Sequence, residues 1–137
     1  MKDRLALLLA AFWWGSLTTI GFLVVPMLFA QLGNPTMAGN FAGQLFAAQT
    51  WIALGCGLVL LVYYRAQGGE RIEGRVSSAI AWIVAALLLA LLQQYAVAPR
   101  ILARENLRLW HSLGSAMYLG QWICAGVLLW RMERKSN

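Results

Sequence analysis

The chain has 137 residues, of which 61% are hydrophobic and only 12% are charged, and its formal net charge is +6. Soluble domains average about 45–50% apolar and about 25% charged residues, so this composition excludes an ordinary soluble domain. The positive charge does not indicate nucleic-acid binding, because the lysines and arginines lie in connections and tails and form no basic face. Anionic lipid headgroups in the bilayer are their expected partners.

Four apolar runs follow one another along the chain, separated by short charged connections. They cover about residues 5–32, 41–64, 76–98 and 109–130. A helix needs about 20 residues to cross a hydrocarbon layer about 30 Å thick, and each run is long enough. The sequence therefore predicts an all-α protein, an integral membrane four-helix bundle that forms a single domain over residues 1–137.

The first run resembles a signal peptide at its start, where Lys2 and Arg4 precede apolar residues. It is longer than the 7–15 apolar residues of a signal peptide, so we expect an uncleaved helix. Under the positive-inside rule, the side of the membrane with more lysine and arginine is the cytoplasmic side. Eight of these residues lie on the side of the termini (Lys2, Arg4, Arg65, Arg71, Arg75, Arg131, Arg134, Lys135) and three on the other (Arg100, Arg104, Arg108). We therefore expect both termini in the cytoplasm, and for a chain of bacterial appearance the membrane is the inner membrane.

The connection between the first two runs has the composition of a helix start. Its sequence is Gly33-Asn34-Pro35-Thr36. An asparagine side chain can cap a helix, and proline is favoured at the first helical position. We expect Asn34 to cap the second helix.

Two features indicate an internal duplication. Pro26 ends the first run as Pro99 ends the third. In the second and fourth runs, Gly43, Trp51-Ile52 and Gly55 match Gly114, Trp122-Ile123 and Gly126 at one constant offset. Each unit is a two-helix hairpin, so both copies cross the membrane in the same direction and pack about an axis along the membrane normal. The alternative to two tandem hairpins in a parallel repeat is a chance match in an apolar background.

Small residues spaced four apart allow helices to pack closely in lipid. We assign Gly15, Gly39, Gly43, Gly57 and Gly120 to helix packing, together with the helix-ending prolines Pro26 and Pro99. These residues mark seams between helices of one bundle. A seam between two copies of the chain is the alternative.

Polar side chains are costly inside a bilayer, so their positions indicate function. The candidates for ligand binding lie in the outer half of the predicted helices: Gln44, Gln94, Arg100, Arg104, His111, Ser115 and Tyr118. If the fourth helix extends upward through residues 100–108, its arginines continue the face of His111 and suit an anionic or carboxylate-bearing ligand. The first interpretation is a polar cavity open to the outer face. The alternatives are interhelical hydrogen bonds without a ligand, and arginines that meet headgroups.

His111, Cys56 and Cys124 are the candidate metal ligands. His111 is the only histidine, so it could supply one axial haem ligand but not a second. The two cysteines lie at similar depth and could hold a soft metal ion if they face each other, although buried cysteine usually acts as a small hydrophobic residue. We therefore expect no cofactor, with haem or a soft metal as the alternative. No catalytic motif occurs, and an enzyme is not the expectation.

Several short motifs resemble a known family. Gly21-Phe22-x3-Pro26-x2-Phe29 and the following Ala38-Gly39-x3-Gly43-x2-Phe46 resemble the start of the transmembrane protein 205-like domain, a domain-of-unknown-function family. Tyr95-x3-Pro99-Arg100 and His111-x3-Ser115 are similar to its third and fourth helices. The resemblance covers nearly the whole chain and implies a four-helix membrane protein. Members have been linked to tolerance of metal-containing drugs. Small four-helix families that handle haem precursors or copper are more distantly similar, and they usually carry more histidines.

Three functions follow from these observations. The first, which we favour, is a small-molecule or ion binding or transport component with an outer cavity. The second is a haem, porphyrin or metal-handling protein that uses His111. The third is a structural or assembly subunit of a membrane complex. Four helices are few for an alternating-access transporter, so transport would require a homodimer or a membrane partner protein.

Overall fold

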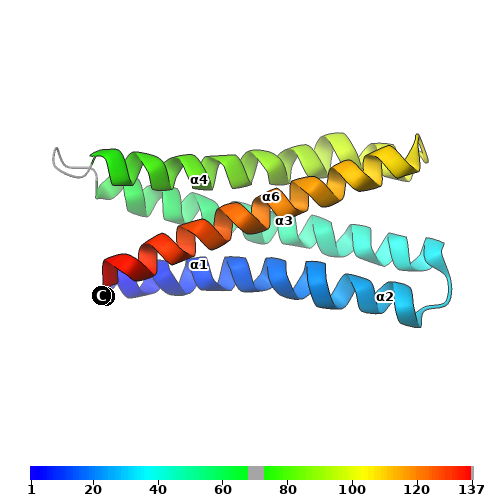
Figure 1. Ribbon diagram of the computed structural model, residues 1–137, viewed down its shortest axis with the longest axis horizontal. Coiled ribbons are helices and arrows are strands. Elements are labelled where there is room, and N and C mark those ends of the chain that lie inside the picture. The colour runs from blue at the N-terminus through cyan, green and yellow to red at the C-terminus, as the bar shows by residue number, and fades with distance from the viewer. Residues whose placement is uncertain (68–72, 137) are drawn as a thin grey trace.

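The computed structural model describes residues 1–67 and 73–136 and forms a bundle of long helices (Figure 1). Arg71 of the charge count lies outside these residues. The first long helix consists of α1 (Lys2–Thr19), the π-helical segment η1 (Ile20–Val24) and α2 (Val25–Gln31); α3 (Pro35–Ala66) follows. The third consists of α4 (Glu73–Leu92), η2 (Gln93–Val97) and α5 (Ala98–Leu102), and α6 (Leu107–Ser136) is the last. The described residues contain no strand, so the predicted all-α class is confirmed.

Four helices are long and apolar enough to cross a membrane. They cover Lys2–Gln31, Pro35–Ala66, Val76–Leu102 and Leu107–Arg134. The prediction of four long apolar helices is therefore confirmed, and each helix after the first begins or ends several residues beyond its apolar run. The second helix starts early because Asn34 caps it: the Asn34 side chain accepts hydrogen bonds from the backbone N–H groups of Thr36 (3.0 Å) and Met37 (3.2 Å).

The two π-helical segments stand directly before the two prolines of the predicted repeat. The residue preceding each proline, Val25 or Ala98, donates its backbone N–H to the carbonyl five residues back. Proline has no N–H and crowds the preceding turn, so a helix interior accommodates it only with a local change of pitch. The wider turn allows both helices to continue through Pro26 and Pro99, which the apolar pattern alone predicted as helix ends.

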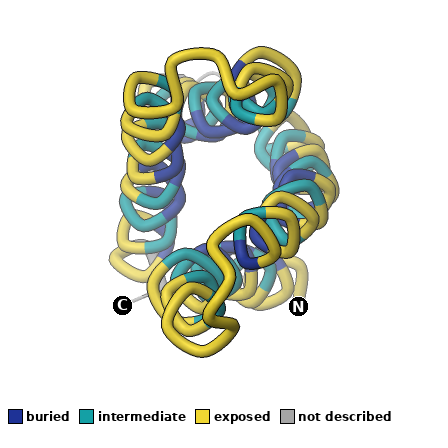
Figure 2. Tube along the Cα trace, turned by 90° about the vertical axis from the view of Figure 1, so that its right-hand side faces the viewer, coloured by how far each residue is buried: buried dark blue, intermediate teal, exposed yellow. Residues whose placement is uncertain are grey.

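The four long helices form a closed ring around one core. The first packs against α3 and α6, and the third packs against the same two helices, so the first and third lie diagonally opposite each other. Figure 2, which looks along the bundle, shows this order. A two-fold axis along the bundle would exchange the two hairpins, which is the arrangement that a parallel repeat requires.

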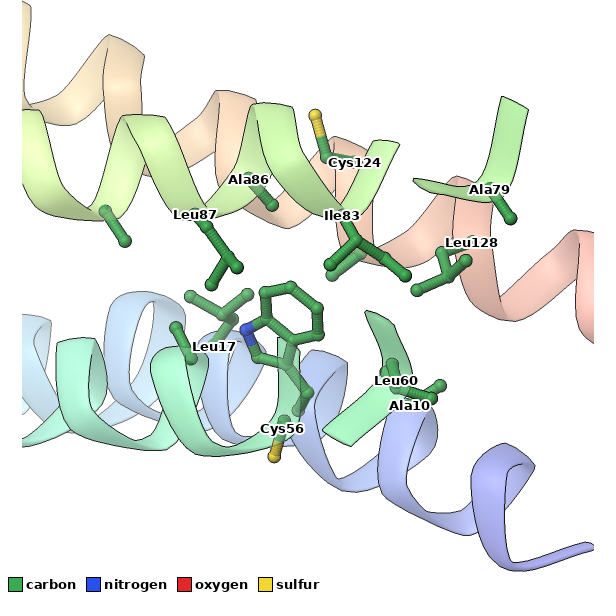
Figure 3. Packing of buried hydrophobic residues seen from close by; sticks show 14 of the residues in the cluster. Ala10, Leu17, Cys56, Leu60, Ala79, Ile83, Ala86, Leu87, Cys124 and Leu128 are labelled. Carbon is green, nitrogen blue, oxygen red and sulfur yellow. The ribbon is translucent and has the colours of Figure 1, made fainter. Parts of the chain in front are cut away.

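The core is concentrated toward the end of the bundle that holds both chain termini, which we call the terminal end (Figures 1 and 3). Its largest buried apolar side chains are Trp13, Leu17, Leu60, Ile83 and Leu128. The opposite end, with the connections 32–34 and 103–106, is the loop end. None of the residues of η1, α2 and α5 is buried. The loop end contains fewer buried side chains, among them Ala38, Ala42 and Val97.

The glycines predicted to pack between helices fall into two groups. A Cβ atom on Gly57 would lie 2.7 Å from Leu87, and one on Gly120 would lie 2.9 Å from Leu89, so both allow close contact with α4. A Cβ atom on Gly15, Gly39 or Gly43 would meet no atom within 4 Å. Gly21 permits the closest contact, because its Cβ atom would lie 2.3 Å from the ring of Tyr118.

We predict that Gly21→Ala lowers the free energy of unfolding by about 1–3 kcal/mol, the usual cost of overpacking a core. The matched change Gly15→Ala in the same long helix adds a methyl group in open space, and it should leave stability unchanged or raise it by up to about 1 kcal/mol through helix propensity. Unfolding by sodium dodecyl sulfate, followed by circular dichroism, measures both. Equal effects of the two variants would contradict the predicted contact.

Candidate functional site

Polar side chains from all four long helices form a layer across the interior of the bundle, which we call the mid-depth polar layer. Its members are Ser16, Thr18, Gln49, Gln93, Tyr118, Gln121 and Trp122. Ser16, Gln49 and Gln121 lie near the middle of their spans. Interhelical hydrogen bonds join these side chains, because lipid offers them no other partner.

Between α1 and α3 the layer contains one side-chain pair. Gln49 Nε2 donates to Ser16 Oγ at 3.0 Å, and Ser16 Oγ donates to the carbonyl of Trp13 at 2.8 Å. Gln49 is 2% exposed, so its amide is removed from lipid and water. The Ser16 hydroxyl therefore bridges the α1 backbone and the Gln49 side chain by two hydrogen bonds.

Between α1 and α6 the contact is both aromatic and hydrogen-bonded. The Tyr118 hydroxyl donates to the carbonyl of Leu17 at 2.8 Å, and Trp122 Nε1 donates to Thr18 Oγ1 at 2.9 Å. The Trp122 ring also stacks on Trp14, with 5.6 Å between ring centroids. These contacts hold α6 against α1 at a fixed rotation.

Between the third helix and α6, a pair of glutamines closes the layer. Gln121 Nε2 donates to Gln93 Oε1 at 2.7 Å. Gln93 is the first residue of η2, so the π-helical segment positions this side chain toward α6. π-helical turns are frequent at functional sites.

Two polar atoms of the core have no hydrogen-bond partner among the described residues. They are Trp13 Nε1, a donor, and Gln49 Oε1, an acceptor. Trp13 is 0% exposed. A buried polar group without a partner costs roughly 1–3 kcal/mol, and such groups are rare. The bundle therefore retains one unused donor on Trp13, one turn before Ser16 on α1, and one unused acceptor on Gln49.

Of the seven predicted ligand-binding residues, Tyr118 belongs to the layer and the others lie around or above it. Gln94 is half-buried in η2 beside Gln93, whereas Gln44 and Ser115 are exposed. His111 is also exposed, yet it precedes Tyr118 by two helical turns on α6 and therefore shares its face of the helix. Between them Gly114 is buried, and a Cβ atom there would lie 3.3 Å from Val97, so the third helix covers this face of α6 to within one turn of His111.

The predicted arginines do not continue the face of α6, because the helix does not extend upward as expected. α5 ends at Leu102, and α6 begins at Leu107; the positive φ angles of Arg104 (55°) and Asn106 (31°) break the helix between them. Arg100 lies 3.5 Å from Glu105 and stacks on Trp110, and Arg104 donates to Thr36 Oγ1 at 3.4 Å. Arg104 therefore links the connection of the second hairpin to the first turn of α3.

The candidate metal ligands lie on separate parts of the bundle. Cys56 is on α3 and Cys124 on α6, two diagonally placed helices, and their sulfur atoms point in opposite directions in Figure 3. His111 lies at the loop end of α6. Within the described ranges, no three His, Cys, Asp or Glu side chains form a group that could hold a metal ion.

A cavity of about 350 Å³ lies at the terminal end, where residues that the sequence did not single out line it. Asp3, Arg4, Tyr63 and Tyr64 form its polar part. The Asp3 carboxylate accepts hydrogen bonds from the Tyr63 hydroxyl and from Gln67 Nε2 at 3.2 Å. These contacts fix the first turn of α1 to the last turns of α3.

Sequence reasoning also did not identify Trp13, Ser16, Thr18 and Gln121 as part of a site. Small hydroxyl side chains are common in membrane helices, where they often bond to their own backbone, as Thr18 does to the Trp14 carbonyl. Gln121 carried a usable signal, since an amide near the middle of an uncharged stretch needs a partner.

Comparison with known proteins assigns the chain to a family. The family model named "Domain of unknown function (DUF4149)" matches residues 8–109, which is more than half of the chain. The match covers the first three long helices and ends near the start of α6. No curated protein and no solved structure matches the chain.

Proposed function

We propose that this chain, which belongs to the DUF4149 family, is a membrane component that binds or transports a small molecule or ion at the mid-depth polar layer. The observation that carries the proposal is the layer itself, since it brings hydrogen-bonding side chains from all four long helices to the middle of their spans. Substrate sites of membrane transporters lie near the bilayer midplane, and intramembrane polar groups mark such pathways.

Access to the layer is from the loop end in this proposal. His111 and Tyr118 share one face of α6, but Tyr118 is buried and His111 is exposed. The absence of buried residues in α2 and α5 likewise favours an opening at this end. With both termini in the cytoplasm of a bacterial cell, the loop end faces outward from the inner membrane.

The resemblance to the transmembrane protein 205-like family is a finer assignment within the same proposal. It rests on the motifs around Pro26, Pro99 and His111. Both prolines follow π-helical segments. The segment before Pro26 begins at Ile20, two residues after Thr18 of the polar layer, and the segment before Pro99 begins at Gln93, which is a member of the layer. The motifs around Pro26 and Pro99 therefore include residues next to the proposed site.

We predict that Gln49→Leu slows solute entry by about tenfold, which corresponds to the loss of about 1.4 kcal/mol of interaction along the path. Purified protein is placed in lipid vesicles, and stopped-flow light scattering follows re-swelling after addition of urea or sodium methanesulfonate, a neutral and an anionic probe. Wild-type vesicles should re-swell faster than protein-free vesicles with at least one probe. Asn40→Leu, a change of an exposed amide on the same helix, should behave as the wild type. Wild-type vesicles that match protein-free vesicles with both probes would refute the transport proposal.

A second copy of the chain is the partner that we propose for this component, packed on the face formed by α3 and the third long helix. Alignment of the repeats pairs Trp122 with Trp51 and Phe22 with Tyr95. Phe22 contacts Trp122 edge-on at 5.4 Å, and Trp122 has a hydrogen-bond acceptor in Thr18. Trp51 and Tyr95 are 68% and 66% exposed.

The exposed residues Trp51 and Tyr95 lack the hydrogen-bond acceptor that Trp122 has in the first helix. Leu91 stands in the third helix where Thr18 stands in the first, so it offers the Trp51 indole no acceptor. Neither Trp51 nor Tyr95 makes a hydrogen bond to a described residue. Across a two-fold axis, each indole N–H could donate to the hydroxyl of the other copy, so the surface is complementary to itself.

We predict that the wild type sediments as a dimer in mild detergent and that the double variant Trp51→Leu/Tyr95→Leu sediments as a monomer. The control Phe12→Leu changes another exposed aromatic side chain on α1 and should leave the dimer intact. Analytical ultracentrifugation measures the mass. A monomeric wild type, or a dimer that survives the double change, would refute this interface.

A further inference from the structure

Among the described residues, two buried side-chain polar atoms have no hydrogen-bond partner, and both belong to residues that contact Ser16 through another atom, Gln49 and Trp13. Gln49 uses its amide N–H to reach Ser16 and leaves Oε1 without a donor. Trp13, whose carbonyl accepts from Ser16, leaves its indole N–H without an acceptor. Both side chains are at most 2% exposed, so neither lipid nor bulk water satisfies them.

The internal repeat indicates that packing does not require this polar contact. Alignment of the hairpins pairs Ser16 with Leu89 and Gln49 with Gly120. Leu89 and Gly120 also meet, and a Cβ atom on Gly120 would lie 2.9 Å from the Leu89 side chain. At the aligned position of the second hairpin, α4 and α6 are therefore held together by an apolar contact. Gln49, whose unpartnered oxygen lowers the stability of the first hairpin, is therefore expected to have a role other than packing α3 against α1.

The chemistry of the two free atoms defines what could satisfy them. Trp13 Nε1 needs an acceptor, and Gln49 Oε1 needs a donor. None of the polar-layer residues is charged, and an ion without a counter-charge would be strongly destabilised at this depth. The complementary partner is therefore a small neutral molecule that has both a donor and an acceptor.

We propose that the contact between α1 and α3 at Ser16 binds such a neutral molecule, which accepts a hydrogen bond from Trp13 Nε1 and donates one to Gln49 Oε1. Water is the smallest member of this class, and urea and other primary amides are larger ones. The proposal rests on the proposed function for the choice of site, and it restricts the substrate to neutral polar molecules. The loop-end arginines, which contact Glu105, Trp110 and Thr36, take no part in it.

Nuclear magnetic resonance of the indole groups tests this binding without requiring transport. The chain has seven tryptophans, and the signal that disappears in Trp13→Phe belongs to Trp13. In lipid nanodiscs, the Trp13 indole proton should show a cross-peak to long-lived water, or a shift that saturates as urea is added. The indole of Trp122, which donates to Thr18, is the internal control and should show neither.

The variant Gln49→Leu removes the proposed acceptor and keeps a side chain of similar volume. It should abolish the Trp13 water cross-peak and the urea response, while the Trp122 signal stays in place as evidence of an intact fold. A Trp13 indole that shows neither effect in the wild type would overturn the proposal, and so would a water cross-peak that persists in Gln49→Leu. Bound water in a protein that admits neither urea nor methanesulfonate would refute the transport proposal alone.

Discussion

The hydrocarbon core of a bilayer offers no hydrogen-bond partner, and this constraint determines the interior of the bundle. Every polar side chain at mid-depth has to find its partner within the protein, either on the backbone of its own helix or on a neighbouring helix. Tyr118 finds the Leu17 carbonyl, Trp122 finds Thr18, and Gln121 finds Gln93. Because each pair joins two different helices, the layer fixes the rotation of α6 against both of its neighbours. The two atoms left unsatisfied, on Trp13 and Gln49, are the exceptions from which we propose the binding of a small neutral molecule.

The paired prolines connect this layer to the internal repeat. Each π-helical segment widens one turn just before Pro26 or Pro99, so both helices cross the bundle without ending there. In the first hairpin the altered turn presents Gly21 to the ring of Tyr118; in the second it presents Gln93 to Gln121. Both hairpins thus contain a π-helical segment before a proline, and they differ in the side chains at several aligned positions of the polar layer. Ser16 and Gln49 against Leu89 and Gly120 are the clearest case.

The fold was largely predictable from the sequence, because apolar length and the Asn34 cap are local signals. The candidate site was less so. Along α6, which is uninterrupted between His111 and Trp122, Tyr118 and Trp122 both contact α1, whereas Ser115 is exposed. The predicted face does not continue across residues 100–108, because the positive φ of Arg104 breaks the helix. The Gln49–Ser16 pair was not predictable, because it depends on how α1 and α3 are rotated against each other. Glycine spacing had the same weakness: Gly57 and Gly120 contact α4, whereas Gly15 and Gly43 face open space.

We propose that an aqueous path leads from the loop end to the mid-depth polar layer, and side-specific thiol labelling can detect this path. Cys56 and Cys124 are first replaced by alanine, and Ser16→Cys is introduced as the reporter in oriented vesicles. The control Leu119→Cys places a thiol on an exposed apolar position of α6. We expect a membrane-impermeant sulfonate thiol reagent to modify Cys at position 16 when it is added on the side of the loops, and we expect the control to stay unmodified from both sides. Labelling of position 16 only from the side of the termini, or from neither side, would contradict the proposed path.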